Sequence, residues 1–253
     1  MRLCYHKISS RLDFGIGTRT PEDFTNDLRW IAAHSPSQRP VVSFDDGYED
    51  TFTEAFPLLS QFGLTASLFV TTDVMGKPNS WDANFFGAFN HISLSQVAEL
   101  SVAGWHIGSH AKTHRALTTL SEADLKTELD VSRQVLEDAT GKAVTEISFP
   151  FGKFDGRVLR ACRKAGYTSA VSISGATPDG YVNRGLAVYR FDTLRQLQAK
   201  FSGNPHELRR LAAINACSGL TVAMQHFKSF LHRNLSPELS FGSKSPARFK
   251  PYT

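Results

Sequence analysis

The stretch VVSFDDGYED, residues 41–50, joins an apolar run to two adjacent acids, Asp45 and Asp46, followed by a glycine. The apolar part has the β-branched and aromatic composition of a buried strand. Two neighbouring carboxylates repel each other unless a cation or a proton relieves the repulsion. The plainer interpretation is a helix N-cap, in which an aspartate before the glycine begins the next helix. The stretch therefore indicates a strand that ends either in a helix cap or in a metal site.

The rest of the chain alternates short apolar runs with longer segments of helical pattern. The expected helices 21–34, 121–141 and 155–166 begin with capping or acidic residues, and the last two end on glycine. Strands that are apolar on both faces indicate a parallel sheet, and seven or eight strand–helix units favour closure into an α/β barrel. The expected strands are 2–6, 40–44, 66–70, 105–109, 146–150, 168–173, 186–190 and 220–225.

Length and composition narrow the class of protein. The 253 residues, 41% of them hydrophobic, fit one domain with a sizeable core, and the formal charge of +4 comes without a basic stripe, so no nucleic-acid partner is expected. The three cysteines are widely spaced and predict reduced thiols. No transmembrane segment and no leader is evident, which favours a cytoplasmic location. We expect a catalytic barrel over 1–230 and a basic, weakly ordered tail over 231–253; the oligomeric state stays open.

A second polar cluster, GWHIGSHAKTHRAL (104–117), also follows an expected strand. Its His110 and His114 have a spacing that lets two imidazoles reach one ion. With Asp46 they would form an Asp-His-His set that leaves positions on the ion open. Two histidines in a polar surface loop are the plainer alternative. A third possibility is an all-histidine site that includes His106, although the strand-like pattern around that residue weighs against it.

Several motifs occur in an order that resembles the polysaccharide deacetylase family, the NodB-homology carbohydrate esterases. The resemblance spans roughly residues 2–230 and implies a distorted (β/α) barrel of about seven strands. It also implies a metal-dependent hydrolase that removes N-acetyl groups from a carbohydrate. The motifs are LCYHKI (3–8), SFDDG (43–47), GKPNSWD (76–82), GSHAKTH (108–114), SFPFGKFD (148–155) and LTVAMQH (220–226).

The family likeness assigns different roles to the two adjacent acids. It implies Asp45 as the catalytic base and Asp46, His110 and His114 as metal ligands. A carboxylate that binds a cation stays ionised, whereas its unligated neighbour is free to accept a proton from water. Zinc is the expected ion, and Co²⁺, Ni²⁺ and Mn²⁺ are compatible with the same ligands.

Further residues are expected at the substrate site. Pro150 and Phe151 resemble the family's groove motif, so Phe151 would line the sugar site and its amide could stabilise an oxyanion, unless its ring is simply core. His226 is the candidate general acid, or else a structural histidine. His6 follows the first strand and is expected to contact substrate or a ligand, with a structural role as the alternative. Trp81 lies in a loop where an indole could stack on a sugar ring.

The chain departs from the family pattern at two positions. Ser148 stands where some members have an arginine that orients the catalytic aspartate, so Arg190, at the end of an expected strand, is the candidate replacement, or else an ordinary ion-pair arginine. Ala111 follows His110 where many members have a hydroxyl, and Thr113 is the candidate to supply one.

The expected partner is therefore an N-acetylated carbohydrate, whether polysaccharide, oligosaccharide or glycan precursor. Two alternatives stay open. One is an amidohydrolase that acts on a small non-sugar amide in a closed cavity rather than an open groove. The other is a catalytically inactive carbohydrate-binding barrel, because the fold alone does not determine function.

Overall fold

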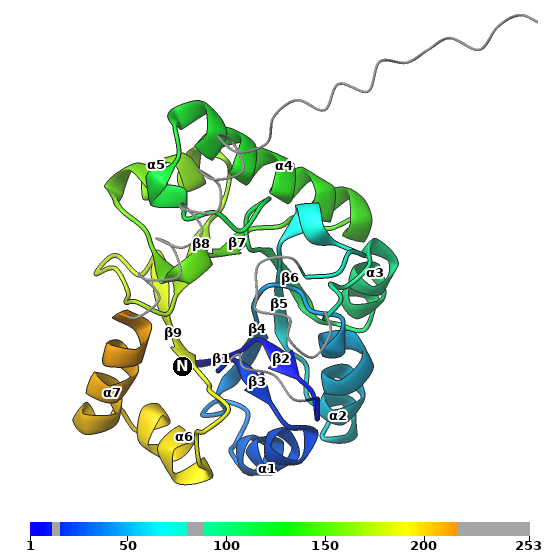
Figure 1. Ribbon diagram of the computed structural model, residues 1–253, viewed down its shortest axis with the longest axis vertical. Helices are drawn as coiled ribbons and strands as arrows, with labels where there is room; N and C mark the ends of the chain where they lie inside the picture. The colour runs from blue at the N-terminus through cyan, green and yellow to red at the C-terminus, as the bar shows by residue number, and fades with distance from the viewer. Residues whose placement is uncertain (12–15, 80–88, 217–253) are drawn as a thin grey trace, which may run out of the picture.

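Seven parallel strands form a closed barrel in the order β1-β4-β5-β6-β7-β8-β9, surrounded by helices (Figure 1). The structure is a computed structural model that describes residues 1–11, 16–79 and 89–216. Strands β2 and β3 form a separate two-stranded sheet. The predicted α/β barrel of about seven strands is thus confirmed. The strands are β1 Arg2–Tyr5, β2 Lys7–Ile8, β3 Thr18–Arg19, β4 Val41–Phe44, β5 Ser67–Val70, β6 His106–Ser109, β7 Glu146–Ser148, β8 Ser169–Ser172 and β9 Val182–Ala187.

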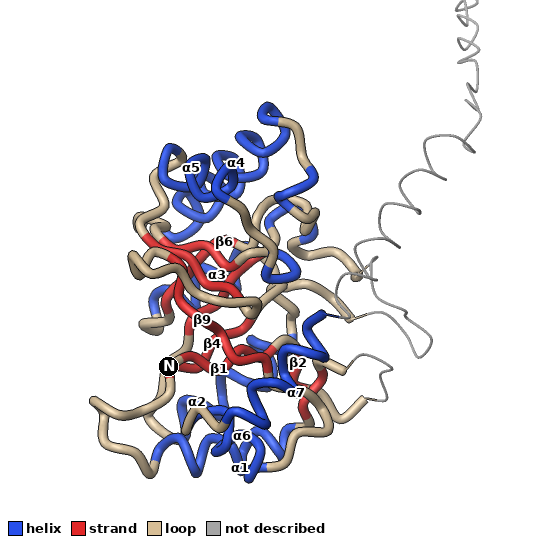
Figure 2. Tube along the Cα trace, turned by 90° about the vertical axis from the view of Figure 1, so that its left-hand side faces the viewer, coloured by secondary structure: helices blue, strands red, loops and turns tan. Residues whose placement is uncertain are grey.

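The helices enclose the barrel and begin where the sequence supplies caps. In Figure 2, α4 and α5 lie on one side of the strands and α1 and α6 on the other. The side chain of Ser121 accepts a hydrogen bond from the first turn of α4, which ends at Gly141 in the left-handed conformation that glycine adopts readily. The described helices include none long and apolar enough to cross a membrane. They are α1 Pro21–Ala32, α2 Phe56–Gln61, α3 Leu94–Val102, α4 Glu122–Thr140, α5 Gly156–Lys164, α6 Leu194–Phe201 and α7 Pro205–Ala216.

The last barrel strand differs from its prediction. The sequence predicts a strand at 186–190, but β9 begins at Val182 and ends at Ala187. Its first half contains the polar run from Asn183 to Gly185, which hides the strand signal. Gly185 nevertheless pairs with Arg2 of β1 and closes the barrel. The predicted strand at 220–225 lies outside the described residues.

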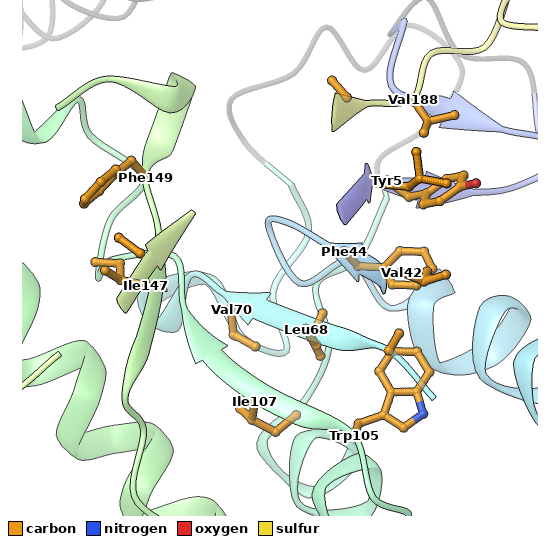
Figure 3. Packing of buried hydrophobic residues seen from close by; sticks show 14 of the residues in the cluster. Tyr5, Val42, Phe44, Leu68, Val70, Trp105, Ile107, Ile147, Phe149 and Val188 are labelled. Carbon is orange, nitrogen blue, oxygen red and sulfur yellow. The ribbon is translucent and has the colours of Figure 1, made fainter. Parts of the chain in front are cut away.

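Aromatic packing fixes the strands that carry polar side chains at their ends. The rings of Phe44 in β4 and Trp105, just before β6, stack with centroids 5.9 Å apart. Tyr5 of β1 packs against Phe44 at 5.7 Å, and all three side chains are buried (Figure 3). Because aromatic pairs of this kind bury large areas, they set the relative positions of β1, β4 and β6.

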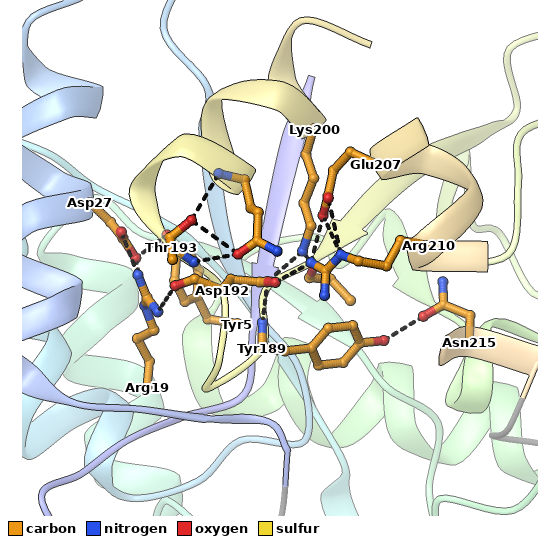
Figure 4. A network of polar contacts seen from close by, with 12 residues as sticks. Tyr5, Arg19, Asp27, Tyr189, Asp192, Thr193, Lys200, Glu207, Arg210 and Asn215 are labelled. Carbon is orange, nitrogen blue, oxygen red and sulfur yellow. Dashed lines mark hydrogen bonds and ion pairs between the residues drawn. The ribbon is translucent and has the colours of Figure 1, made fainter. Parts of the chain in front are cut away.

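A buried polar network joins the end of the barrel to the first helix (Figure 4). Asp192 forms ion pairs with Lys200 and Arg210, and its backbone carbonyl accepts a hydrogen bond from Arg19 at 2.6 Å. Arg19 also forms an ion pair with Asp27 of α1 at 2.8 Å. Buried charges persist only when they are paired and hydrogen-bonded, so the network locks the segment after β9 against α1.

Candidate active site

The carboxyl ends of the strands bring the predicted site residues to one rim of the barrel. Asp45 and Asp46 follow β4, His110 follows β6, and Pro150 and Phe151 follow β7. In a parallel barrel these ends open on the same face. Residues that lie far apart in the sequence can therefore meet there.

Asp46, His110 and His114 converge on one point. The Oδ1 atom of Asp46 lies 3.3 Å from Nε2 of His110 and 3.1 Å from Nε2 of His114. The three residues are buried, and they form one of two groups of metal-ligand type in the described part of the chain. One carboxylate oxygen and two imidazole nitrogens are a donor set that suits a divalent transition metal.

A hydrogen bond orients His110, and the two histidines keep Asp46 ionised. The Nδ1–H of His110 donates to the backbone carbonyl of Ser148 at 2.8 Å, which leaves Nε2 facing Asp46. Burial alone would raise the pKa of Asp46, but His114 and His110 hold it well below its ordinary value. Burial alone would lower the pKa of His110, whereas Asp45 and Asp46 raise it. The carboxylate is thus kept ionised in a dry position.

A buried glutamate shapes the loop between the two histidines. Glu128 of α4 accepts hydrogen bonds from the backbone N–H groups of Lys112 and Thr113, at 2.9 and 2.8 Å, and from the hydroxyl of Thr113. Thr113 therefore holds the loop through Glu128. The hydroxyl of Thr113, the candidate substitute for the one missing at Ala111, is thus bonded to Glu128. Sequence reasoning missed Glu128, because a polar residue within a helix carries no distinguishing signal.

Backbone strain is concentrated at the same rim. Among the described residues, the non-glycine positions with positive φ are Asp46, Ala111, His114 and Phe151, with φ between 58° and 70°. Such conformations cost about 1–3 kcal/mol each and persist where the surroundings enforce them, often at functional sites. All of these residues belong to the motifs after β4, β6 and β7. The strain therefore points to the same site as the donor geometry.

Asp45 is held on one side only. Its Oδ2 atom accepts hydrogen bonds from the Ser148 hydroxyl at 3.0 Å and the Cys4 thiol at 3.2 Å. Its Oδ1 atom is buried and has no hydrogen-bond partner within the described ranges. A carboxylate with one oxygen fixed and the other unpartnered has the form expected of a proton acceptor.

The structure places both residues connected with the missing motif arginine, Ser148 and Arg190. Ser148, which replaces that arginine, itself contacts Asp45. Arg190 lines a surface pocket together with Trp30 and Phe191, and its backbone N–H donates to Ile16. Its role in orienting the base stays a prediction.

Comparison with known proteins identifies the family of the chain. The family model for polysaccharide deacetylases matches residues 33–170. The chain belongs to the polysaccharide deacetylase family. The family resemblance of the motifs is thereby confirmed.

Curated deacetylase relatives match most of the chain. It is 27% identical over 213 residues to the "Putative polysaccharide deacetylase YxkH" of Bacillus subtilis, which covers 76% of this chain and 70% of that protein. It is 23% identical over 193 residues to the poly-beta-1,6-N-acetyl-D-glucosamine N-deacetylase of Staphylococcus aureus, with 64% of each protein covered. The chain thus spans about two thirds of the length of these relatives.

Solved deacetylase structures share the barrel. The deacetylase PplD of Streptococcus pyogenes superposes with a TM-score of 0.66 at 18% identity, covering 79% of this chain and 96% of that one. The polysaccharide deacetylase BC0361 of Bacillus cereus gives a TM-score of 0.65 at 22% identity, covering 79% and 67%. At these identities the likeness shows the fold.

The Pro150–Phe151 segment lies after β7, at the same rim as His114, and its role in binding substrate stays a prediction. The Phe151 ring lies 4.8 Å from the ring of His114, between centroids, and Pro150 beside it is buried. His6 is half-buried, and its ring belongs to a second group of ligand-type atoms with Cys4 and Asp45. Trp81 and His226 lie outside the described residues, so their roles stay predictions.

The all-histidine alternative is wrong. His106 is the first residue of β6, and its side chain, 46% exposed, lies 3.3 Å from Glu146 at the start of β7. A spacing of four brings side chains together on a helix, but on a strand it separates them by about 13 Å. His106 therefore lies at the opposite end of the barrel from His110.

One more histidine beside the metal-ligand group was not predicted. The Nδ1 of His91 lies 3.3 Å from the backbone carbonyl of Asp46, and its ring stacks on Tyr48 at 4.8 Å. Burial lowers the pKa of His91 despite the nearby Asp46. No motif surrounds His91, so nothing in the sequence pattern indicated that it lies at the site.

Proposed function

We propose that the protein is a metal-dependent hydrolase that removes N-acetyl groups from a carbohydrate. The observation that carries the proposal is the pair of adjacent acids in different surroundings. Asp46 lies against two histidine Nε2 atoms, whereas Asp45 keeps one buried oxygen without a described partner. Hydrolysis of an amide by a metal-activated water uses a Lewis-acidic ion and a base. Asp46, with the two histidines, would hold the ion, and Asp45 would be the base.

Asp46 and the two histidines suit a divalent cation. Asp46, His110 and His114 would hold it, because their donor atoms converge and lie within 4.8 Å of one another in a buried position. When bound, such an ion supplies a Lewis acid that polarises an acetyl carbonyl and makes a water molecule more acidic. Zinc suits one oxygen and two nitrogen donors, and Co²⁺, Ni²⁺ or Mn²⁺ would suit them as well.

Asp45 would act as the base that takes a proton from the attacking water. Asp45 would accept the proton of the attacking water at its Oδ1 atom. Ser148 and Cys4 fix its Oδ2 atom and so hold the carboxylate in one orientation. A base that is already oriented needs little rearrangement during the reaction, and this lowers the barrier.

The substrate would lie along the Pro150–Phe151 segment. The Phe151 ring beside His114 offers a surface for a sugar. The backbone N–H of Phe151 is the candidate donor to the oxyanion. We further propose His226 as the acid that protonates the leaving amine and Trp81 as a stacking residue. The Staphylococcus aureus relative is named for poly-beta-1,6-N-acetyl-D-glucosamine, so oligomers of N-acetylglucosamine are the first substrates to test. A cytoplasmic location remains part of the proposal.

The test is acetate release from N-acetylglucosamine oligomers after removal and return of metal. We expect activity that is lost with a chelator and restored by Zn²⁺, and that falls by about 10²–10⁴-fold in Asp45→Asn. Turnover of a small acetamide but of no sugar would instead support the amidohydrolase alternative. Glycan binding with a normal metal content and no acetate release from any substrate would support a non-catalytic barrel.

A further inference from the structure

A second set of ligand-type side chains lies beside the first. Cys4 in β1, His6 just after β1 and Asp45 after β4 offer a sulfur, a nitrogen and an oxygen atom that lie within 4.8 Å of one another. Cys4 pairs with Ser43 in the register of β1 and β4, so the strands bring these residues together. Sulfur, nitrogen and oxygen are the three donor types that bind zinc in proteins.

Two atoms of this set are buried without hydrogen-bond partners. Nδ1 of His6 and Oδ1 of Asp45 are both shielded from solvent, and neither has a partner in the part of the chain that the structure describes. Buried polar atoms are almost always paired, because an unpaired one costs about 1–3 kcal/mol. A bound cation would satisfy both atoms at once.

The thiol is already placed for the same ion. The Sγ atom of Cys4 lies 3.2 Å from Oδ2 of Asp45 and is fully buried. Binding would break the S–H bond, form a metal–sulfur bond and release the proton to solvent. Thiolate and carboxylate together would neutralise a divalent charge. A thiophilic ion such as Zn²⁺ or Cd²⁺ is favoured over Mg²⁺ or Ca²⁺, which prefer oxygen ligands.

We propose that Cys4, His6 and Asp45 form a second, inhibitory cation site. An ion held there engages Asp45, so this carboxylate can no longer accept a proton from water. Two neighbouring cations repel each other, and this site must in addition lose the thiol proton of Cys4, a step with no counterpart at the Asp46 site. The second site therefore fills only when metal is in excess of the first. The inhibition rests on the proposed function, whereas the cation site itself does not.

Cadmium titration of the whole chain tests the site without any substrate. The wild type is expected to bind about two Cd²⁺, and the second equivalent produces the ultraviolet thiolate-to-cadmium charge-transfer band. Cys4→Ser keeps a hydrogen-bond donor to Asp45 but loses the band and the second equivalent. Cys162→Ser and Cys217→Ser are the matched controls, and both should keep the band. A band that survives in Cys4→Ser, or that disappears in Cys217→Ser instead, overturns the proposal.

A second variant separates binding from folding. His6→Ala leaves the buried thiol in place and removes the nitrogen donor, so the second equivalent should bind at least about tenfold more weakly. Thermal unfolding of each variant shows whether it is folded. If His6→Ala is folded and binds the second Cd²⁺ as tightly as the wild type does, the assigned ligand set is wrong.

Inhibition is measured as the ratio of acetate release at excess Zn²⁺ to that at one equivalent. In the wild type, acetate release at saturating excess Zn²⁺ should be about 100-fold or more lower than at one equivalent, because a positioned base contributes about 10²–10⁴-fold. In Cys4→Ser the ratio should stay near one at the same zinc concentration. Equal inhibition of both proteins contradicts the proposal. If no protein releases acetate, the proposed function fails, and the cadmium titration still decides the cation site.

Discussion

Replacing Ser148 by alanine removes one of the two donors that hold the carboxylate of Asp45. The hydroxyl of Ser148 donates to Oδ2 at 3.0 Å in a buried position. The other donor is the thiol of Cys4 at 3.2 Å, and an S–H group is a weak donor. A hydrogen bond to a charged group contributes about 1.5–3 kcal/mol, and 1.4 kcal/mol is about tenfold in rate. We therefore expect kcat/KM to fall by about 10- to 150-fold.

The assay is acetate release over a range of oligosaccharide concentrations, with metal content measured on the same samples. The loss should be in kcat, with KM changed by less than about twofold, because Asp45 acts on water rather than on the sugar. Metal content should not change, since His110 donates to the backbone carbonyl of Ser148 and not to its side chain.

Two variants serve as controls. Ser148→Thr keeps a hydroxyl and should recover part of the activity. Ser43→Ala removes a buried hydroxyl that donates to a backbone carbonyl in the neighbouring strand, and it should have less than about a threefold effect on kcat. An unchanged kcat in Ser148→Ala would show that the Ser148 hydroxyl does not hold the base in place. Equal losses in Ser148→Ala and Ser43→Ala would show that the effect is one of general packing.

Three further predictions follow from the structure. Glu128→Gln weakens the hold on the loop between His110 and His114. It should lower the free energy of unfolding by about 1–3 kcal/mol, measured by denaturant unfolding, and weaken metal binding, measured by titration. Tight metal binding in a folded variant would contradict the role of Glu128 in holding this loop. Burial alone would raise the pKa of Glu146, but His106 and Arg2 lower it below the ordinary value of 4.5. Because the pKa of Glu146 is lower in the folded protein than in the unfolded chain, its carboxylate stabilises the fold above the ordinary value of 4.5. This contribution is lost as the pH falls through the pKa of Glu146 in the folded protein. Glu146→Gln should therefore be less stable than wild type at pH 7, with a difference that shrinks as the pH falls below 4.5 and through the folded pKa; a difference independent of pH would be inconsistent with this. Phe151→Ala should raise KM for the oligosaccharide by about fivefold or more, and an unchanged KM would mean that the ring does not contact substrate.

The main elements and the ligand group could be predicted because both depend on local pattern. Capping residues predicted α4 to within a residue at each end. Asp46, His110 and His114 each follow a strand or lie in the loop after it, and closure of a parallel barrel brings strand ends together whatever their separation in sequence. Strand-end position and the histidine spacing favoured the Asp-His-His group, and the family resemblance selected it over the helix cap and the surface loop.

The supporting contacts could not be predicted because they depend on packing between distant segments. Glu128 reaches the histidine loop only because α4 packs over it, and the sequence around Glu128 is that of an ordinary amphipathic helix. Ser148 looked like the loss of a motif arginine, yet barrel closure brings its hydroxyl to Asp45. Cys4 looked like a core thiol, and only the pairing of β1 with β4 shows that it faces the same carboxylate.

The different roles of Asp45 and Asp46 are tested by measuring metal content at one added equivalent of Zn²⁺, together with acetate release, in the wild type, Asp46→Ala and Asp45→Asn. Asp46→Ala should lose both metal and activity. Asp45→Asn should keep about one metal ion per chain while turnover falls by about 10²–10⁴-fold. If both variants bind metal as the wild type does, or if Asp45→Asn loses the ion, the division of roles between the two adjacent aspartates is wrong.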